Sequence, residues 1–80
     1  MKYMLDKDIK KWIYRHFKWW VYEVLYLAKN TETLRKFVVY KSIDKNEIWI
    51  RKKEEFMELI DTKNIIPRFK YIWNETYKTY

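Results

Sequence analysis

The sequence predicts a mostly β protein: a small bent antiparallel sheet or barrel of four to five strands, with one short helix near residues 53–60. Three observations predict it. Apolar residues recur with a period of two over short runs, the runs are separated by turn-forming Asn, Asp and Thr, and helical spacing returns over one short stretch. A barrel removes exposed strand edges, and an open sheet with the helix on one face is the alternative.

The first half of the chain predicts a hairpin. Residues 1–11 have apolar positions near helical spacing, so we expect a short helix or an arm there. From Trp12 the period changes to two, which places His16 and Tyr14 on one face of a first strand. Residues 20–28 are almost continuously apolar, as in a strand covered on both faces. Residues 29–33 are turn formers that should close a hairpin onto residues 34–41.

The second half predicts a fourth strand over residues 48–51, followed by the helix with Phe56, Leu59 and Ile60 on one side. Residues 65–73 form the final strand, in which Pro67 favours an edge or a bulge. The 80 residues make a single domain with its core in residues 12–73 and a loose tail at 74–80. Since the chain has no Gly, the positive-φ turn positions should fall to Asn30, Asn46, Asn64 or nearby Asp residues.

The composition excludes several ways of stabilising a chain this short. It has no Cys and one His, which excludes disulfides, thiolate metal sites and an imidazole cluster, so we expect no metal and no cofactor. Five Trp, eight Tyr and four Phe offer a large area for burial, and Tyr and Trp also favour interfaces. We therefore expect a homo-oligomer.

The net charge of +7 predicts a partner that carries phosphate groups. The absence of Gly and the abundance of Lys, Ile, Tyr and Asn also fit an AT-rich genome, that of a low-GC bacterium or its phage, and solubility alone is the alternative role of the charge. No apolar run approaches the roughly 20 residues of a membrane span. There is also no basic leader with an apolar stretch and a cleavage site, so we expect a cytoplasmic protein away from membranes.

The residue types argue against catalysis. A nucleophile needs a base beside it, and the chain offers His16 and Ser42 as its one His and one Ser. His16 and Glu32 would form a base pair if the hairpin brought them together, but a structural histidine is the favoured interpretation. Neither a Gly-rich phosphate loop nor a carboxylate-rich metal motif is present. The prediction is that the protein is not an enzyme.

Binding fits the residue types better. Arginine and lysine contact phosphate, aromatic rings stack on bases, and short polar loop residues read ribose or base edges. The alternative is that the aromatic residues are core or dimer contacts and the arginines are surface ion-pair partners. The candidate ligand-binding residues are Tyr14, Arg15, His16, Lys18, Thr31, Glu32, Thr33, Tyr40, Trp49, Arg51 and Arg68, and the candidate partner-binding residues are Trp19 and Trp20.

Short motifs recur in a fixed order between residues 14 and 69. They are Tyr14 to Lys18, Tyr22 to Leu25, Glu32 and Thr33, Val38 to Tyr40, Trp49 and Arg51, Phe56, and Pro67 to Phe69. No single motif is specific, but the ordered set at compatible spacing resembles a bacterial and phage family catalogued as domain of unknown function 1653.

The chain departs from the family pattern in three places. Trp19 and Trp20 follow the first motif where the family usually has Gly, Asn30 replaces the His of the turn, and Lys52 replaces a Pro. We therefore expect a different or wider turn at Trp19 and Trp20, with their two indole rings available to solvent or to a partner.

Three functions remain open from the sequence. The favoured one is a non-catalytic module for a nucleotide-type anion, for example a phage protein that sequesters a signalling nucleotide, with Arg15, Arg51 and Arg68 on phosphate and Tyr40 and Trp49 as stacking residues. The first alternative is a small RNA- or DNA-binding barrel, which the dispersed lysines favour. The second is a protein-interaction or inhibitor module that presents the exposed Trp residues.

Overall fold

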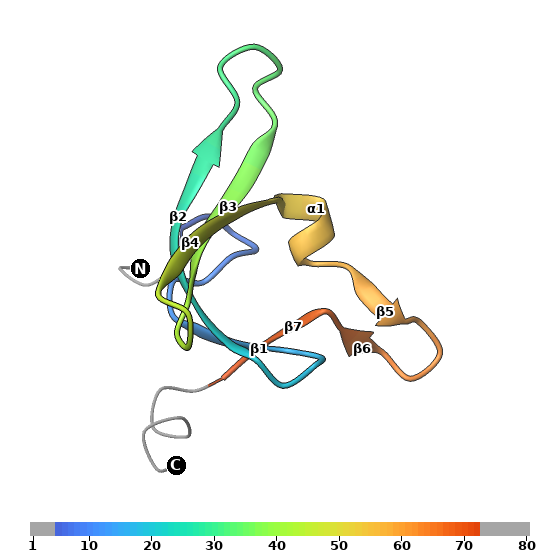
Figure 1. The fold of residues 1–80 in the computed structure, drawn as a ribbon. Coiled ribbons are helices and arrows are strands. Elements are labelled where there is room, and N and C mark those ends of the chain that lie inside the picture. Colours follow the sequence, from blue (N-terminus) through green and yellow to red (C-terminus); the bar gives the residue numbers. More distant parts are fainter. Residues whose placement is uncertain (1–4, 73–80) are drawn as a thin grey trace.

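A computed structural model describes residues 5–72. Five strands form one antiparallel sheet in the order β4-β3-β2-β1-β7, and two short strands form a separate hairpin, β5-β6. In Figure 1 the chain leaves β4 through α1 and this hairpin and returns as β7 at the opposite edge of the sheet. The elements are β1 (Ile13–His16), β2 (Val21–Lys29), β3 (Lys36–Ser42), β4 (Glu47–Lys52), α1 (Lys53–Phe56), β5 (Leu59–Asp61), β6 (Ile66–Pro67) and β7 (Phe69–Tyr71).

The predicted mostly β class is confirmed, and the sheet is open. The barrel alternative is not observed, because β4 and β7 lie at the two ends of the strand order and do not pair with each other. The four strands predicted between residues 12 and 51 are present with small differences at their ends. Period-two alternation therefore located the main sheet.

The predicted helix over residues 53–60 is too long. The helix ends at Phe56, and Leu59 and Ile60 belong to β5, where both are exposed. The carbonyl of Glu58 accepts a hydrogen bond from the N–H of Arg68 at 2.8 Å, which holds this segment against the chain before β7. Pairing with a distant segment thus overrides the local helical spacing.

The core lies between the sheet and α1 and is built from aromatic rings. Phe56 stacks on Phe69 with ring centroids 4.1 Å apart and an interplanar angle of 9°. Tyr14 and Tyr40 meet the Phe56 ring edge-on, at 5.1 and 5.7 Å. Alternation along the strands turns Val38, like Tyr40, toward this cluster. The core therefore joins β1, β3, α1 and β7.

Residues 5–11 form an arm with no helix, the second of the two predicted alternatives. The arm extends the core beyond the predicted start at residue 12, because Ile9 is fully buried. Asp6 holds it in place: its Oδ1 accepts the N–H groups of Asp8 and Ile9, and its Oδ2 lies 2.8 Å from Lys53 Nζ. The hydrogen bond from Lys53 is the main cause that holds the pKa of Asp6 well below its usual range. The predicted loose tail at 74–80 lies outside the described residues.

Positive φ falls mostly on large apolar residues. Asn46 takes φ 56°, as predicted, but Asn30 and Asn64 do not have positive φ. Asn30 Oδ1 instead accepts the N–H groups of Glu32 and Thr33, and Asn64 bonds to Asp61. The other positive-φ positions in the turns are therefore occupied by large apolar residues, whose side chains do not favour this backbone conformation. These are Trp19 (77°), where the resembled family has Gly, Leu34 (62°) and Ile65 (55°).

Replacing Ile65 by Asn is expected to stabilise the protein by about 1 kcal/mol, since a β-branched side chain is strongly disfavoured at positive φ and Asn tolerates it. Ile65 is exposed, so the change removes little packing. Urea denaturation of both proteins measures the difference. A loss of stability would show that the Ile65 side chain contributes more by contact than its φ costs.

Candidate functional site

A polar cavity of about 260 Å³ opens beside the aromatic core. Its wall comes from the β1–β2 turn, the start of β7, and the inner face of the sheet. The inner face is the one on which β2, β3 and β4 carry Tyr22, Tyr40 and Arg51. Three of its lining residues carry positive charge, and none of the described lining residues is acidic. The lining residues are His16, Phe17, Lys18, Trp20, Tyr22, Tyr40, Arg51, Arg68 and Phe69.

The β1–β2 turn positions Lys18 at the cavity. The N–H of Lys18 donates to His16 Nδ1 at 3.2 Å, and the N–H of His16 donates to the carbonyl of Trp20 at 2.8 Å. The N–H of Phe17 donates to the carbonyl of Arg68 at 2.9 Å, which ties the turn to the segment before β7. Two cationic residues far apart in the sequence are therefore brought to the same opening.

Arg51 reaches the cavity from β4. Its Nε donates to the Tyr40 hydroxyl at 3.4 Å, and its guanidinium carbon lies 5.6 Å from the centre of the Phe69 ring. Tyr40 is itself part of the core and is about 5% exposed. The contacts hold the guanidinium against the cavity wall and use one of its five N–H groups.

Arg68 is held from the other side. Its Nη2 lies 2.8 Å from Glu58 Oε1, and its guanidinium carbon is 5.8 Å from the centre of the Phe17 ring. Its Nε is buried and finds no hydrogen-bond acceptor among residues 5–72. A buried donor without an acceptor is costly, so this guanidinium is incompletely satisfied where it borders the cavity.

The pKa of His16 is affected by the positive charges around the cavity. The imidazole is buried among aromatic rings, with Phe17 at 4.4 Å and Phe69 at 4.9 Å between centroids. Burial lowers the pKa of His16, and the positive charges of Arg51, Arg68 and Lys18 lower it further. The three cations therefore act on one point without a carboxylate on the cavity wall, which is an arrangement suited to an anion.

The structure brings together about half of the predicted ligand-binding residues. His16, Lys18, Tyr40, Arg51 and Arg68 line the cavity, and so does Trp20, which was predicted to bind a partner. Phe17, Tyr22 and Phe69 also line it and were not singled out as site residues. Their signal in the sequence is the alternation of β2 for Tyr22 and proximity to His16 and Arg68 for the two Phe residues.

The other predicted residues lie elsewhere. Tyr14 is in the core, and Arg15 lies on the face of β1 opposite to His16, with its guanidinium 5.2 Å from the Trp19 ring. Trp49 shares the inner face with Arg51 but does not line the cavity. The remaining three, Thr31, Glu32 and Thr33, are exposed in the β2–β3 turn.

His16 and Glu32 are not brought together. His16 ends β1 near the start of β2, whereas Glu32 lies in the turn between β2 and β3, beyond the far end of β2. Figure 1 shows this turn as the tip of the long hairpin formed by β2 and β3. The N–H of Glu32 donates to Asn30 Oδ1 at 2.8 Å, a bond within the turn itself. The acid–base pair weighed from the sequence therefore does not form.

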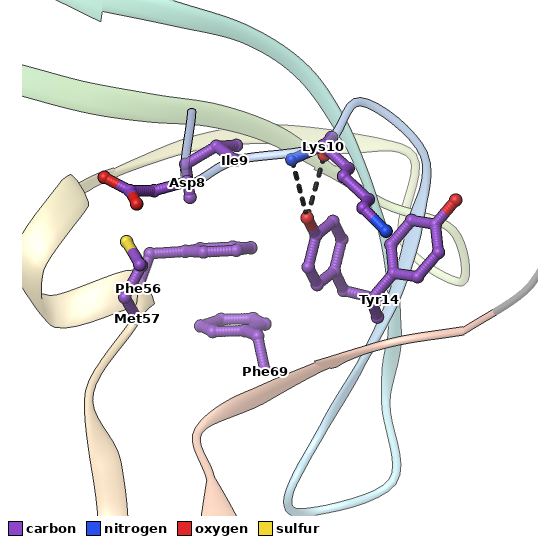
Figure 2. Close-up of a pocket in the computed structure, with 8 residues that line it drawn as sticks. Asp8, Ile9, Lys10, Tyr14, Phe56, Met57 and Phe69 are labelled. Atoms are coloured by element: carbon purple, nitrogen blue, oxygen red, sulfur yellow. Dashed lines mark hydrogen bonds between the residues drawn. The ribbon is translucent and has the colours of Figure 1, made fainter. Parts of the chain in front are cut away.

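A second cavity of about 250 Å³, which Phe69 also lines, has aromatic rings as half of its lining residues. Figure 2 shows Phe56 stacked above Phe69, with the Tyr14 hydroxyl directed at the backbone of Lys10. That hydroxyl donates to the Lys10 carbonyl at 2.8 Å and accepts its N–H at 3.1 Å, and burial raises the pKa of Tyr14 to about 12. Tyr14 thus fixes the N-terminal arm to the core, which is a structural role.

Residues 5–72 lack two kinds of feature. Residues 5–72 contain no cluster of three or more His, Cys, Asp or Glu side chains placed to bind a metal ion. Over the same residues, no helix has the length and apolar character needed to cross a membrane.

The comparisons with known proteins agree on the family. No curated protein matches the chain. A crystal structure of a DUF1653 protein from Bordetella bronchiseptica is similar, with 31% sequence identity and a TM-score of 0.72, over 82% of this chain and 90% of that one. The model of the family described as "Protein of unknown function (DUF1653)" matches residues 12–71. The resemblance seen in the motifs is therefore confirmed, and the chain belongs to the DUF1653 family.

Proposed function

We propose that this protein is a non-catalytic module that binds a nucleotide-type anion in the cavity lined by Lys18, Arg51 and Arg68. The observation that carries the proposal is the convergence of these three cations from separate parts of the chain on one opening without an acidic lining residue. Arginine guanidinium groups bind phosphate oxygens in pairs, and a lysine adds a point charge. The three groups together suit a phosphate or a short polyphosphate.

An aromatic surface beside the cations supports a nucleotide over a bare phosphate. Trp20 lines the cavity and is 51% exposed, so one face of its indole is available for stacking. Tyr40, a stacking candidate from the sequence, is 5% exposed and instead orients Arg51. The volume of about 260 Å³ is just below the roughly 300–1,000 Å³ of most small-molecule sites, which fits a held phosphate and a partly exposed base.

Sequestration is the role that we propose for such a module, acting in the cytoplasm of a bacterium or of a phage-infected cell. His16 supports binding over catalysis, since its Nδ1 accepts the Lys18 N–H within the turn. The depressed pKa keeps the imidazole neutral near pH 7. Its place in the turn is that of a structural residue.

Native mass spectrometry of freshly purified protein tests the proposal directly. A retained, stoichiometric mass of nucleotide size is the expected result, followed by identification of the released molecule. If nothing is retained, titration with a panel of mononucleotides and dinucleotides is the second measurement. Failure to bind any member of the panel, together with tight binding of single-stranded RNA or DNA, would contradict the proposal.

The dependence of binding on salt separates a pocket from a nucleic-acid groove. Counterion release makes the affinity of a groove with six or more phosphate contacts fall by orders of magnitude between about 50 and about 200 mM salt. A pocket that holds two or three phosphates has a much shallower slope. A protein partner is a different case, which the strongly exposed Trp19 favours; its binding would be lost in Trp19→Ala while nucleotide binding remained.

Anion affinity is expected to rise as the pH falls, because of His16. Its pKa in the free protein is lowered, and a bound anion beside it raises that pKa, so binding takes up a proton. Inorganic sulfate is a suitable probe, since its charge is constant in this range. Calorimetry at about pH 7.5 and about pH 5.5 should show tighter binding at the lower pH, and His16→Asn should remove the difference. Equal affinity at both pH values would mean that the anion binds away from His16.

A further inference from the structure

Strand β4 forms one edge of the five-stranded sheet and pairs on one side with β3. Three successive large apolar residues on this edge, Ile48, Trp49 and Ile50, are exposed. An edge strand presents unpaired N–H and C=O groups. Monomeric proteins usually protect such an edge with charged residues, Pro or a bulge. The six residues of β4 pair with β3 without a bulge and contain no Pro, and the charges of the strand, on Glu47, Arg51 and Lys52, lie at its two ends and leave its centre apolar.

We propose that the free edge of β4 pairs with β4 of a second copy of this chain, antiparallel about a two-fold axis at Trp49. A two-fold axis perpendicular to the sheet keeps the inner faces of both copies on one side. Residues that face each other across it must therefore lie on the same face of β4. The pairing joins the two five-stranded sheets into one continuous sheet.

The side chains of β4 are complementary in this register. Glu47 lies opposite Arg51 of the second copy, so that opposite charges meet twice, once on each side of the axis. Ile48 lies opposite Ile50 of the second copy, and the two Trp49 side chains meet at the axis. Opposite charges and apolar pairs directly across two strands are the contacts that stabilise antiparallel sheets.

The neighbouring registers are poorer matches. A shift of two residues in one direction sets Ile48 against Lys52 and Trp49 against Arg51. A shift in the other direction sets Glu47 against Trp49 and leaves Arg51 beyond the paired segment. The sequence of β4 therefore favours the Trp49-centred register over its alternatives.

This inference and the proposed anion binding share Arg51, and substitutions at other residues of β4 test the two separately. Ile50 lies on the sheet face opposite to Arg51 and does not line the cavity. A substitution at Ile50 therefore affects the edge and leaves the cationic lining in place. Glu47 is likewise exposed and outside the cavity.

Sedimentation equilibrium of Ile50→Lys against wild-type protein tests the interface. Wild-type protein is expected to reach twice the 10.4 kDa chain mass as its concentration rises. Ile50→Lys should weaken dimerisation by roughly tenfold or more, because the change occurs twice in the symmetric contact and places Lys against an apolar residue. Leu34→Lys is the matched control: Leu34 is 68% exposed, Ile50 is 65% exposed, and Leu34 lies in a turn away from β4. Unchanged far-UV circular dichroism and an unchanged thermal unfolding midpoint in both variants would show that the fold is retained.

A charge exchange tests the register. Glu47→Arg alone should weaken the dimer, since it sets like charges opposite each other, and Glu47→Arg combined with Arg51→Glu should restore it. The double variant should have weaker anion binding than Glu47→Arg alone, because Arg51 lines the cavity and Glu47 does not. Two results would overturn the inference: a wild-type chain that stays monomeric at about 0.5 mM, or a dimer that Ile50→Lys and Leu34→Lys affect equally.

Discussion

Replacing Phe56 by Ala is expected to destabilise the protein by about 3–5 kcal/mol, the range for truncating a buried aromatic residue. Phe56 is 2% exposed and stacks on Phe69 at 4.1 Å, and two Tyr rings meet its edge. It is also the one buried residue of α1, so its ring attaches the helix to the sheet. Because a domain of this size has a total stability of only about 5–10 kcal/mol, much of the population should unfold on mild heating.

Urea denaturation followed by tryptophan fluorescence measures the loss. Met57→Ala is the matched control: Met57 is the next residue and is 43% exposed, so its truncation should cost less than about 1 kcal/mol. Similar losses for the two variants would mean that α1 is held by something other than the Phe56 ring. Substitution by Leu, which fills part of the space, should recover some of the stability that Ala loses.

The main sheet could be predicted because its signal is local. Alternation along β1 and β3 marks which side chains face the core, and the Asn-rich turns mark the hairpins. The end of the helix could not be predicted in the same way. Leu59 and Ile60 continue a helical spacing after Phe56, and only the pairing of β5 with β6 places them in a strand. That pairing depends on contacts between segments that the local pattern does not describe.

The candidate site was predicted in its charges better than in its geometry. Arg51 and Arg68 do reach one cavity, but residue type cannot show that Tyr40 would be buried while Trp20 stayed exposed. The curvature of the sheet and the position of α1 decide which aromatic rings are covered. Thr31 to Thr33 were included for their polarity, and the length of β2 carries them away from the cations. The kind of ligand could be predicted from the types of single residues. Which of these residues meet at one cavity depends on the fold.

Replacing Arg51 by Ala is expected to weaken anion binding by about 10- to 150-fold, the equivalent of losing one charge-assisted interaction of about 1.5–3 kcal/mol. Arg51 is the cation best placed for the role. The Tyr40 hydroxyl and the Phe69 ring hold its guanidinium at the cavity, and within residues 5–72 of its own chain no carboxylate forms an ion pair with it. Arg51→Lys should recover part of the affinity, since it keeps the charge and loses the paired N–H groups.

Calorimetric titration with inorganic pyrophosphate compares these variants with Arg35→Ala. Arg35 is an exposed residue between β2 and β3, so its loss changes the net charge by the same amount and leaves the cavity intact. If binding occurs in the cavity, Arg35→Ala should change the affinity by less than about twofold. Arg35 does not line the cavity, and its exposed charge is screened by salt. Equal, modest losses of affinity in Arg51→Ala and Arg35→Ala would instead indicate that binding depends on the net positive charge of the protein and not on the cavity. The ligand would then be an extended polyanion such as single-stranded nucleic acid, bound along the surface and not in one pocket.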